Sequence, residues 1–118
     1  MHKRHSDKLL YFNEQVFTTE KYVIPFIRKA INIETSTRIL EIGCGEGGNL
    51  KPFLDLGCEV TGIDILPNKI ENANKFLNGH QLHSKARFIT NDIYLAEDQL
   101  EKYDIIMMRD VIEHIHDQ

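Results

Sequence analysis

The segment that most constrains the fold is EIGCGEGG, residues 41–48, which continues directly from the apolar run RIL at 38–40. A short apolar run that ends in several glycines predicts a buried strand followed by a tight turn into a helix. Glycines suit such a turn because a ligand can then approach the backbone closely, where Cβ atoms would clash. The segment therefore predicts a ligand-binding loop at the carboxyl end of a strand.

The rest of the chain repeats this strand-to-helix unit. Strands are predicted at 38–42, 59–64, 86–92 and 103–110, with helices at 49–57 and 67–79, a short helical piece after 92, and a helix start at 111–118. Regular alternation of this kind predicts an α/β fold, a Rossmann-like doubly wound parallel sheet with helices on both faces. Acids recur at or near the strand ends, so one edge of the sheet is expected to collect carboxylates.

Two helices are predicted before the first strand. One apolar face is formed by Leu9, Phe12 and Val16, and a second by Val23, Phe26, Ile27, Ala30 and Ile31. Pro25 must lie in the first turn of the second helix or kink it. Residues 1–33 are thus expected to form an N-terminal helical segment ahead of a Rossmann-like domain at 34–118.

Composition limits the function classes. The chain has 118 residues, a formal net charge of -4 and a pI near 5.8, so it forms one domain without the basic footprint of a nucleic-acid-binding protein. No apolar run is long enough for a membrane span, and the first residues do not include the apolar stretch that is typical of a signal peptide. Cys44 and Cys58 have no metal or redox spacing, which predicts reduced thiols in a cytoplasmic protein. His80, His83 and His116 match no motif and are interpreted as surface residues.

The glycine spacing alone fits two kinds of cofactor loop. Counted through Gly48, the loop is G-x-G-x-x-G, the dinucleotide pattern. Counted from Glu41 to Gly47, it is E-x-G-x-G-x-G, the pattern that holds S-adenosylmethionine in many methyltransferases. A carboxylate at Glu41 would repel a pyrophosphate but favour the cationic ammonium and sulfonium of S-adenosylmethionine, and Glu46 adds a second negative charge. The charges therefore favour the methyl donor.

Two further acids have both a binding interpretation and a structural one. Asp64, at the end of the second predicted strand, can accept the ribose hydroxyls of either cofactor, or act as a helix cap ahead of Pro67. In a methyltransferase the acid after the third strand lies beside the adenine. Asp92 would there accept the exocyclic amine, with Ile65 and Ile93 as apolar walls, although it can equally be a cap or turn residue.

These residues resemble the class I S-adenosylmethionine-dependent methyltransferases, in particular their small-molecule branch. The segments ILEIGCGEGGNL, VTGIDI, FITNDI and YDIIMMRDVIEHI are similar to four motifs of that family, in the same order. The resemblance implies that the N-terminal helices cover the cofactor and that Arg109 contacts it through the backbone. The cofactor-binding residues that we expect are Glu41, Gly43, Cys44, Gly45, Gly47, Asp64, Ile65, Asn91, Asp92, Ile93 and Arg109.

The segment DVIEH places Asp110, Glu113 and His114 on one face of a helix start. It is similar to the E-x-x-E-H of metal-assisted O-methyltransferases, in which a divalent ion polarises the substrate hydroxyl, but has Asp110 in place of the first Glu. Metal-free relatives also carry D-x-x-E-H, and we expect no metal. Three alternatives stay open for these residues: a metal site, a role of His114 as an orienting residue or general base, and a purely structural role at the helix start.

The resemblance implies a sheet of seven strands ordered 3-2-1-4-5-7-6, of which this chain supplies four in the order 3-2-1-4. We therefore expect the N-terminal, cofactor-binding half of a longer methyltransferase, with strands 5–7 absent. Its fourth strand would be an exposed apolar edge, which a homodimer could cover.

The predicted function is S-adenosylmethionine-dependent methyl transfer to an O, N or C nucleophile of a small molecule, with no catalytic residue assigned. The alternatives are an NAD-dependent Rossmann oxidoreductase and a non-catalytic module that binds a cofactor or a partner. No nucleic acid or membrane partner is expected.

Overall fold

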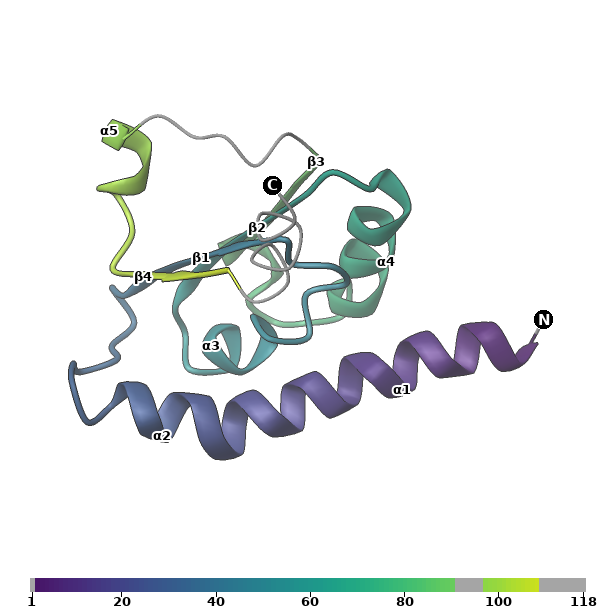
Figure 1. Cartoon of the computed structure of the whole chain (residues 1–118), viewed down its shortest axis with the longest axis horizontal. Helices are drawn as coiled ribbons and strands as arrows, with labels where there is room; N and C mark the ends of the chain where they lie inside the picture. The colour runs from purple at the N-terminus through teal and green to yellow at the C-terminus, as the bar shows by residue number, and fades with distance from the viewer. Residues whose placement is uncertain (1, 91–96, 109–118) are drawn as a thin grey trace, which may run out of the picture.

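The computed structural model describes residues 2–90 and 97–108 and contains a central sheet with helices packed along it (Figure 1). Its helices are α1 (His2–Thr18), the π-helical turn η1 (Thr19–Val23), α2 (Ile24–Ile27), α3 (Lys51–Asp55), α4 (Pro67–Leu77), the 3-10 turn η2 (His83–Lys85) and α5 (Glu97–Leu100). Its strands are β1 (Arg38–Ile42), β2 (Glu59–Asp64), β3 (Ala86–Thr90) and β4 (Ile105–Met107).

The sheet has the strand order β3-β2-β1-β4 with every pairing parallel, which confirms the predicted topology. β1 and β2 have the predicted bounds and pair from Arg38 with Glu59 to Ile42 with Ile63. β4 begins later than expected, at Ile105. The predicted ends of the third and fourth strands, at 91–92 and 109–110, lie outside the described residues.

The main core lies on the face of the sheet that α3 and α4 cover. Pro52 and Pro67 stand in the first turns of these two helices, where their missing N–H groups have no helical acceptor. The apolar side chains that face the sheet are buried: Leu50, Phe53 and Leu54 around α3, and Ile70, Ala73 and Leu77 in α4. The chain leaves α3 through Gly57, whose φ of +91° suits a glycine.

The opposite face of the sheet carries a smaller cluster. Leu40, Ile42 and Ile63 are buried there, and Leu100 and Tyr103 from the segment around α5 pack against them. Alternation along β1 therefore directs Leu40 to this face and its neighbour Glu41 to the other, toward α1 and α3.

The N-terminal segment differs from the prediction of two separate helices. α1, η1 and α2 form one continuous rod alongside α3 and α4 (Figure 1), and helical dihedral angles run through both junctions. The π turn precedes Pro25, which has no N–H to donate and whose ring would clash in an ordinary helix interior. Within it the N–H of Ile24 donates to the carbonyl of Thr19, five residues back.

The extra residue of the π turn changes which side chains face the core. Phe12 and Ile24 are buried in the main core, and Val16 and Ile27 pack against it. After the π turn, the predicted face was wrong for Phe26, Ala30 and Ile31, which are exposed, and it missed Ile24. Leu9, which precedes the π turn, is exposed as well. A periodicity of 3.6 residues cannot anticipate an inserted residue, which rotates everything after it by about 100°.

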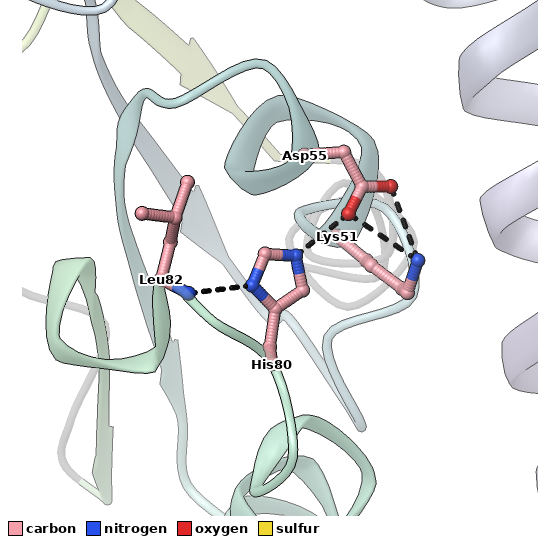
Figure 2. A network of polar contacts seen from close by, with 4 residues as sticks. All are labelled: Lys51, Asp55, His80 and Leu82. Carbon is pink, nitrogen blue, oxygen red and sulfur yellow. Dashed lines mark hydrogen bonds and ion pairs between the residues drawn. The ribbon is translucent and has the colours of Figure 1, made fainter.

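His80 is not a free surface residue as predicted. Its Nε2 lies 2.7 Å from Oδ1 of Asp55, while its Nδ1 accepts the N–H of Leu82 at 2.9 Å (Figure 2). Lys51 also binds Asp55, at 3.1 Å. The network joins the end of α3 to the connection between α4 and β3, at the edge of the sheet where β2 begins.

No helix within the described ranges has both the length and the apolar character needed to cross a membrane.

We expect Phe53→Ala to lower the free energy of unfolding by about 3–5 kcal/mol, because it empties a fully buried site in the main core. Phe26→Ala is the matched control. That side chain is 71% exposed, so its loss should change stability by less than about 0.5 kcal/mol. Urea unfolding followed by circular dichroism measures both, and equal losses would contradict this description of the core.

Candidate functional site

The glycine loop is fastened to the end of β2 through its backbone. The N–H groups of Gly43 and Cys44 both donate to the carbonyl oxygen of Ile63, at 2.8 and 3.0 Å. The loop then closes on itself, because the N–H of Gly47 donates to the carbonyl of Cys44 at 3.0 Å. The first residues of the loop therefore extend the pairing of β1 with β2 past the end of β1.

The loop needs glycine at several positions, for different structural reasons. Gly43, Gly45 and Gly47 have φ angles of +77°, +57° and +85°, which side-chain-bearing residues rarely adopt. Gly48 is not among the positive-φ residues, but a Cβ there would lie 2.7 Å from the carbonyl oxygen of Phe12 in α1. The three glycines of E-x-G-x-G-x-G thus set the backbone of the loop, whereas Gly48 admits the N-terminal helix.

Gly45 has more open surroundings than Gly47 and Gly48 in the same loop. A Cβ built on it would meet no atom within 4 Å, whereas one on Gly47 would lie 2.9 Å from the ring of Phe88. The space beside Gly45 borders the carboxylate of Asp64, which accepts the Gly45 N–H at 2.9 Å.

Asp64 joins the loop to the start of α4. Its Oδ2 accepts from Gly45, and its Oδ1 accepts the N–H of Leu66 at 3.0 Å. α4 has no side-chain cap, so the Asp64 carboxylate stabilises the turn before Pro67 and is not the helix cap that the sequence left open. Ile65, which follows Asp64, is 61% exposed at the same edge of the sheet.

Glu41 lies beneath the loop and is 1% exposed. Its Oε2 accepts from Nδ2 of Asn49 at 2.8 Å, and Oδ1 of Asn49 accepts from the hydroxyl of Thr19 at 2.8 Å. All three side chains are buried. Hydrogen bonds therefore link the carboxylate of Glu41 in β1, through Asn49 just before α3, to Thr19 in the π turn η1. Sequence reasoning gave no role to Thr19, which stands in no motif, or to Asn49, although Asn49 lies in the segment ILEIGCGEGGNL; their contacts span 30 and 8 residues.

Glu46 does not face a ligand in the way that the sequence argument assumed. It is 3% exposed, its Oε1 lies 3.7 Å from Nζ of Lys69, and its Oε2 accepts from Asn72 at 3.2 Å. Both partners belong to α4, so Glu46 fastens the loop to that helix. The electrostatic argument for a cationic ligand therefore depends on Glu41 and Asp64.

The thiol of Cys44 is packed against Gly62, where a Cβ would lie 2.7 Å from its Sγ. Burial raises the pKa of this thiol well above its ordinary value, and the nearby carboxylates of Glu41, Asp64 and Glu46 raise it further. Cys44 is therefore protonated and unreactive, and it fills space under the loop. Both cysteines are free, as predicted.

The structure thus brings together Glu41, the glycine loop, Asp64 and Ile65 at the carboxyl edge of the sheet. Seven other residues singled out from the sequence lie outside the described residues: Asn91, Asp92, Ile93, Arg109, Asp110, Glu113 and His114. Within 2–90 and 97–108, no group of three or more His, Cys, Asp or Glu side chains could hold a metal ion.

Residues 12–118 match a protein family described as a methyltransferase domain. The chain is 35% identical over 89 residues to the ubiquinone biosynthesis O-methyltransferase of Rhodopseudomonas palustris (strain BisA53), covering 75% of this chain and 34% of that protein. It is 29% identical over 119 residues to the protein of the same name from Bartonella quintana (strain Toulouse), covering 99% of this chain and 45% of that one. The chain therefore spans less than half the length of these relatives.

Among solved structures, the fold is similar to magnesium protoporphyrin IX methyltransferase from Synechocystis PCC 6803 with bound S-adenosylmethionine. The TM-score is 0.67 with 24% identity over 86% of this chain and 47% of the other. An RNA methyltransferase from Salinibacter ruber in complex with S-adenosylhomocysteine has a TM-score of 0.62 with 17% identity, covering 75% of this chain and 57% of the other. At these identities the likeness concerns the fold.

We expect Gly48→Ala to lower the free energy of unfolding by about 1–3 kcal/mol, because the new methyl group would push against the backbone of α1 at Phe12. Gly79→Ala is the control, since a Cβ there meets no atom within 4 Å and its φ is not positive. Thermal unfolding of the two variants beside the wild type is the measurement. A Gly48→Ala protein as stable as the control would contradict the contact between α1 and the loop.

Proposed function

Since this chain belongs to the methyltransferase-domain family, we propose that it binds S-adenosylmethionine at the glycine loop and serves methyl transfer to a small molecule. The observation that carries the proposal is the position of two carboxylates around one loop. Glu41 lies buried beneath the loop, and Asp64 lies beside Gly45 at its open side. This arrangement favours a cation and hydroxyl donors, and opposes the pyrophosphate of a dinucleotide.

The described residues fit the cofactor by their chemistry. Asp64 has two carboxylate oxygens that can each accept more than one hydrogen bond, so it can keep the Gly45 N–H and still accept ribose hydroxyls. Glu41 supplies negative charge for the α-ammonium, and because it is buried, solvent ions screen this charge little. The open space at Gly45 lets the ligand lie against the backbone.

In methyl transfer the nucleophile of the acceptor attacks the methyl group in line with the sulfonium, which the cofactor supplies when bound. The contribution of this chain is to hold the cofactor in one orientation, which lowers the entropic cost of the reaction. Asn91, Asp92, Ile93 and Ile65 are proposed as the adenine side of the site, and Arg109 as a backbone contact. Residues 1–33 are proposed as the cover of the cofactor, separate from the Rossmann-like part at 34–118.

The acceptor atom is proposed to be oxygen, because the relatives that match the chain over most of its length are O-methyltransferases. No residue is assigned to remove the proton of the acceptor. An alternative role remains for Asp110, Glu113 and His114: the three bind a metal ion, or His114 acts as an orienting residue or general base. Both cysteines are thiols, which supports a reducing, cytoplasmic location.

Calorimetric titration of the chain with S-adenosylhomocysteine and with NAD tests the cofactor. We expect S-adenosylhomocysteine to bind and Asp64→Asn to weaken it by at least about tenfold, because the neutral amide is a poorer acceptor for two hydroxyls. Asp55→Asn is the control, since Asp55 binds Lys51 and His80 at the other edge of the sheet (Figure 2). NAD binding without adenosyl binding would overturn the proposal in favour of the oxidoreductase.

A second proposal concerns assembly: two chains cover each other's β4, which is an edge strand of the described sheet and has Ile106 40% exposed. An apolar edge strand offers unpaired backbone groups to a second strand. We expect light scattering to give a dimer that Ile106→Lys converts to monomer. A wild-type protein that is monomeric at all concentrations would contradict this proposal.

A further inference from the structure

We propose that Thr19, in the π turn of the N-terminal helix, is a positioning residue for the cofactor, which orients Glu41 through Asn49. This inference rests on the proposed binding of S-adenosylmethionine and goes beyond it, because it makes the amino-acid end of the ligand depend on the N-terminal helix. Thr19 itself does not touch the ligand.

The three side chains form a directed series of hydrogen bonds. The Thr19 hydroxyl donates to Oδ1 of Asn49 at 2.8 Å, and Nδ2 of Asn49 donates to Oε2 of Glu41 at 2.8 Å. Every donor therefore points toward the carboxylate. Thr19, Asn49 and Glu41 are 0%, 2% and 1% exposed, and in such surroundings successive hydrogen bonds polarise and strengthen one another.

Asn49 is aimed at these two partners rather than at the helix that it precedes. An Asn just before a helix commonly caps the free N–H groups of the first turn. Here α3 begins at Lys51 with Leu50 at its N-cap position and no side-chain cap, and the two ends of the Asn49 amide are directed to Thr19 and Glu41. These two contacts hold the amide from both sides, and removing the Thr19 hydroxyl takes away one of them.

The π turn sets the place of Thr19. Thr19 is the first residue of η1, and its carbonyl accepts the N–H of Ile24 across the widened turn. Earlier in the same rod, in α1, the carbonyl oxygen of Phe12 lies against Gly48 of the loop. The helix therefore meets the glycine loop at Gly48 and its neighbour Asn49. π turns inside helices are frequent at functional sites, and this one places a polar residue in the core without a break in the helix.

The test compares two ligands that differ at the end that Glu41 would hold. S-adenosylhomocysteine carries an α-amino and a carboxylate group, whereas 5′-methylthioadenosine has the same adenosine and thioether without either. We expect Thr19→Val to weaken S-adenosylhomocysteine about fivefold and to change 5′-methylthioadenosine by less than about twofold. Thr19→Ser, which keeps the hydroxyl, should retain the wild-type ratio of the two affinities.

Thr37→Val is the matched control, because Thr37 is also buried and its hydroxyl accepts the N–H of Glu34 at 2.8 Å, before the start of β1. Thr37→Val should leave the ratio of the two ligand affinities unchanged even if it lowers the free energy of unfolding. If Thr19→Val does not fold, Thr19→Ala removes the same hydroxyl without placing a methyl group against the amide of Asn49. In a Glu41→Gln background, Thr19→Val should no longer alter the ratio, since the charge that it orients is gone.

The outcomes separate the inference from the function that it rests on. A wild-type chain that binds neither ligand contradicts the proposed cofactor and with it this inference. Binding of both ligands, with Thr19→Val weakening them equally or not at all, overturns the inference alone. The inference alone is also overturned if Thr19→Val changes the ratio of the two affinities equally in the wild-type and in the Glu41→Gln background.

Discussion

The parallel pairing of β1 with β2 is the interaction on which the site depends. The register brings Ile42 beside Ile63, and the next two N–H groups, of Gly43 and Cys44, both donate to the Ile63 carbonyl. The ladder is thereby carried past the end of β1, and the glycine loop begins in a fixed position over β2. Asp64 follows Ile63 directly and so meets the Gly45 N–H. A shift of register by one residue would move Asp64 to the other face and undo this contact.

Three carboxylates gather around a single loop, and each is held by its own partners. Asn49 donates to Glu41, Lys69 and Asn72 hold Glu46, and the N–H groups of Gly45 and Leu66 hold Asp64. Charges in such a group would repel one another without these partners. Glu41 and Asp64 support the proposed cationic ligand, whereas Glu46 is paired with α4. Burial, and after it these three carboxylates, raise the pKa of the Cys44 thiol and keep it protonated.

The N-terminal helix is part of the same architecture rather than an appendage to the sheet. Phe12 and Ile24 enter the main core with Leu50 and Phe53. The π turn allows this, because it absorbs Pro25 and shifts the helix so that Ile24 and Thr19 both face inward. A polar residue buried there would be costly without a partner, and the amide of Asn49 provides one.

The sequence by itself determined the α/β class, the bounds of β1 and β2 and the place of the glycine loop, and the family resemblance implied the strand order. The class and the strand bounds follow from local patterns, since alternation and helical spacing involve residues close in the chain. Only the tertiary structure decided that Glu46 faces α4, that His80 binds Asp55, that Gly48 admits α1, and that Thr19 reaches Glu41 through Asn49. Each of these contacts joins residues of different elements, and the π turn moved the helix face that periodicity predicted. Their partners could therefore be identified only after the sheet and helices had been assembled.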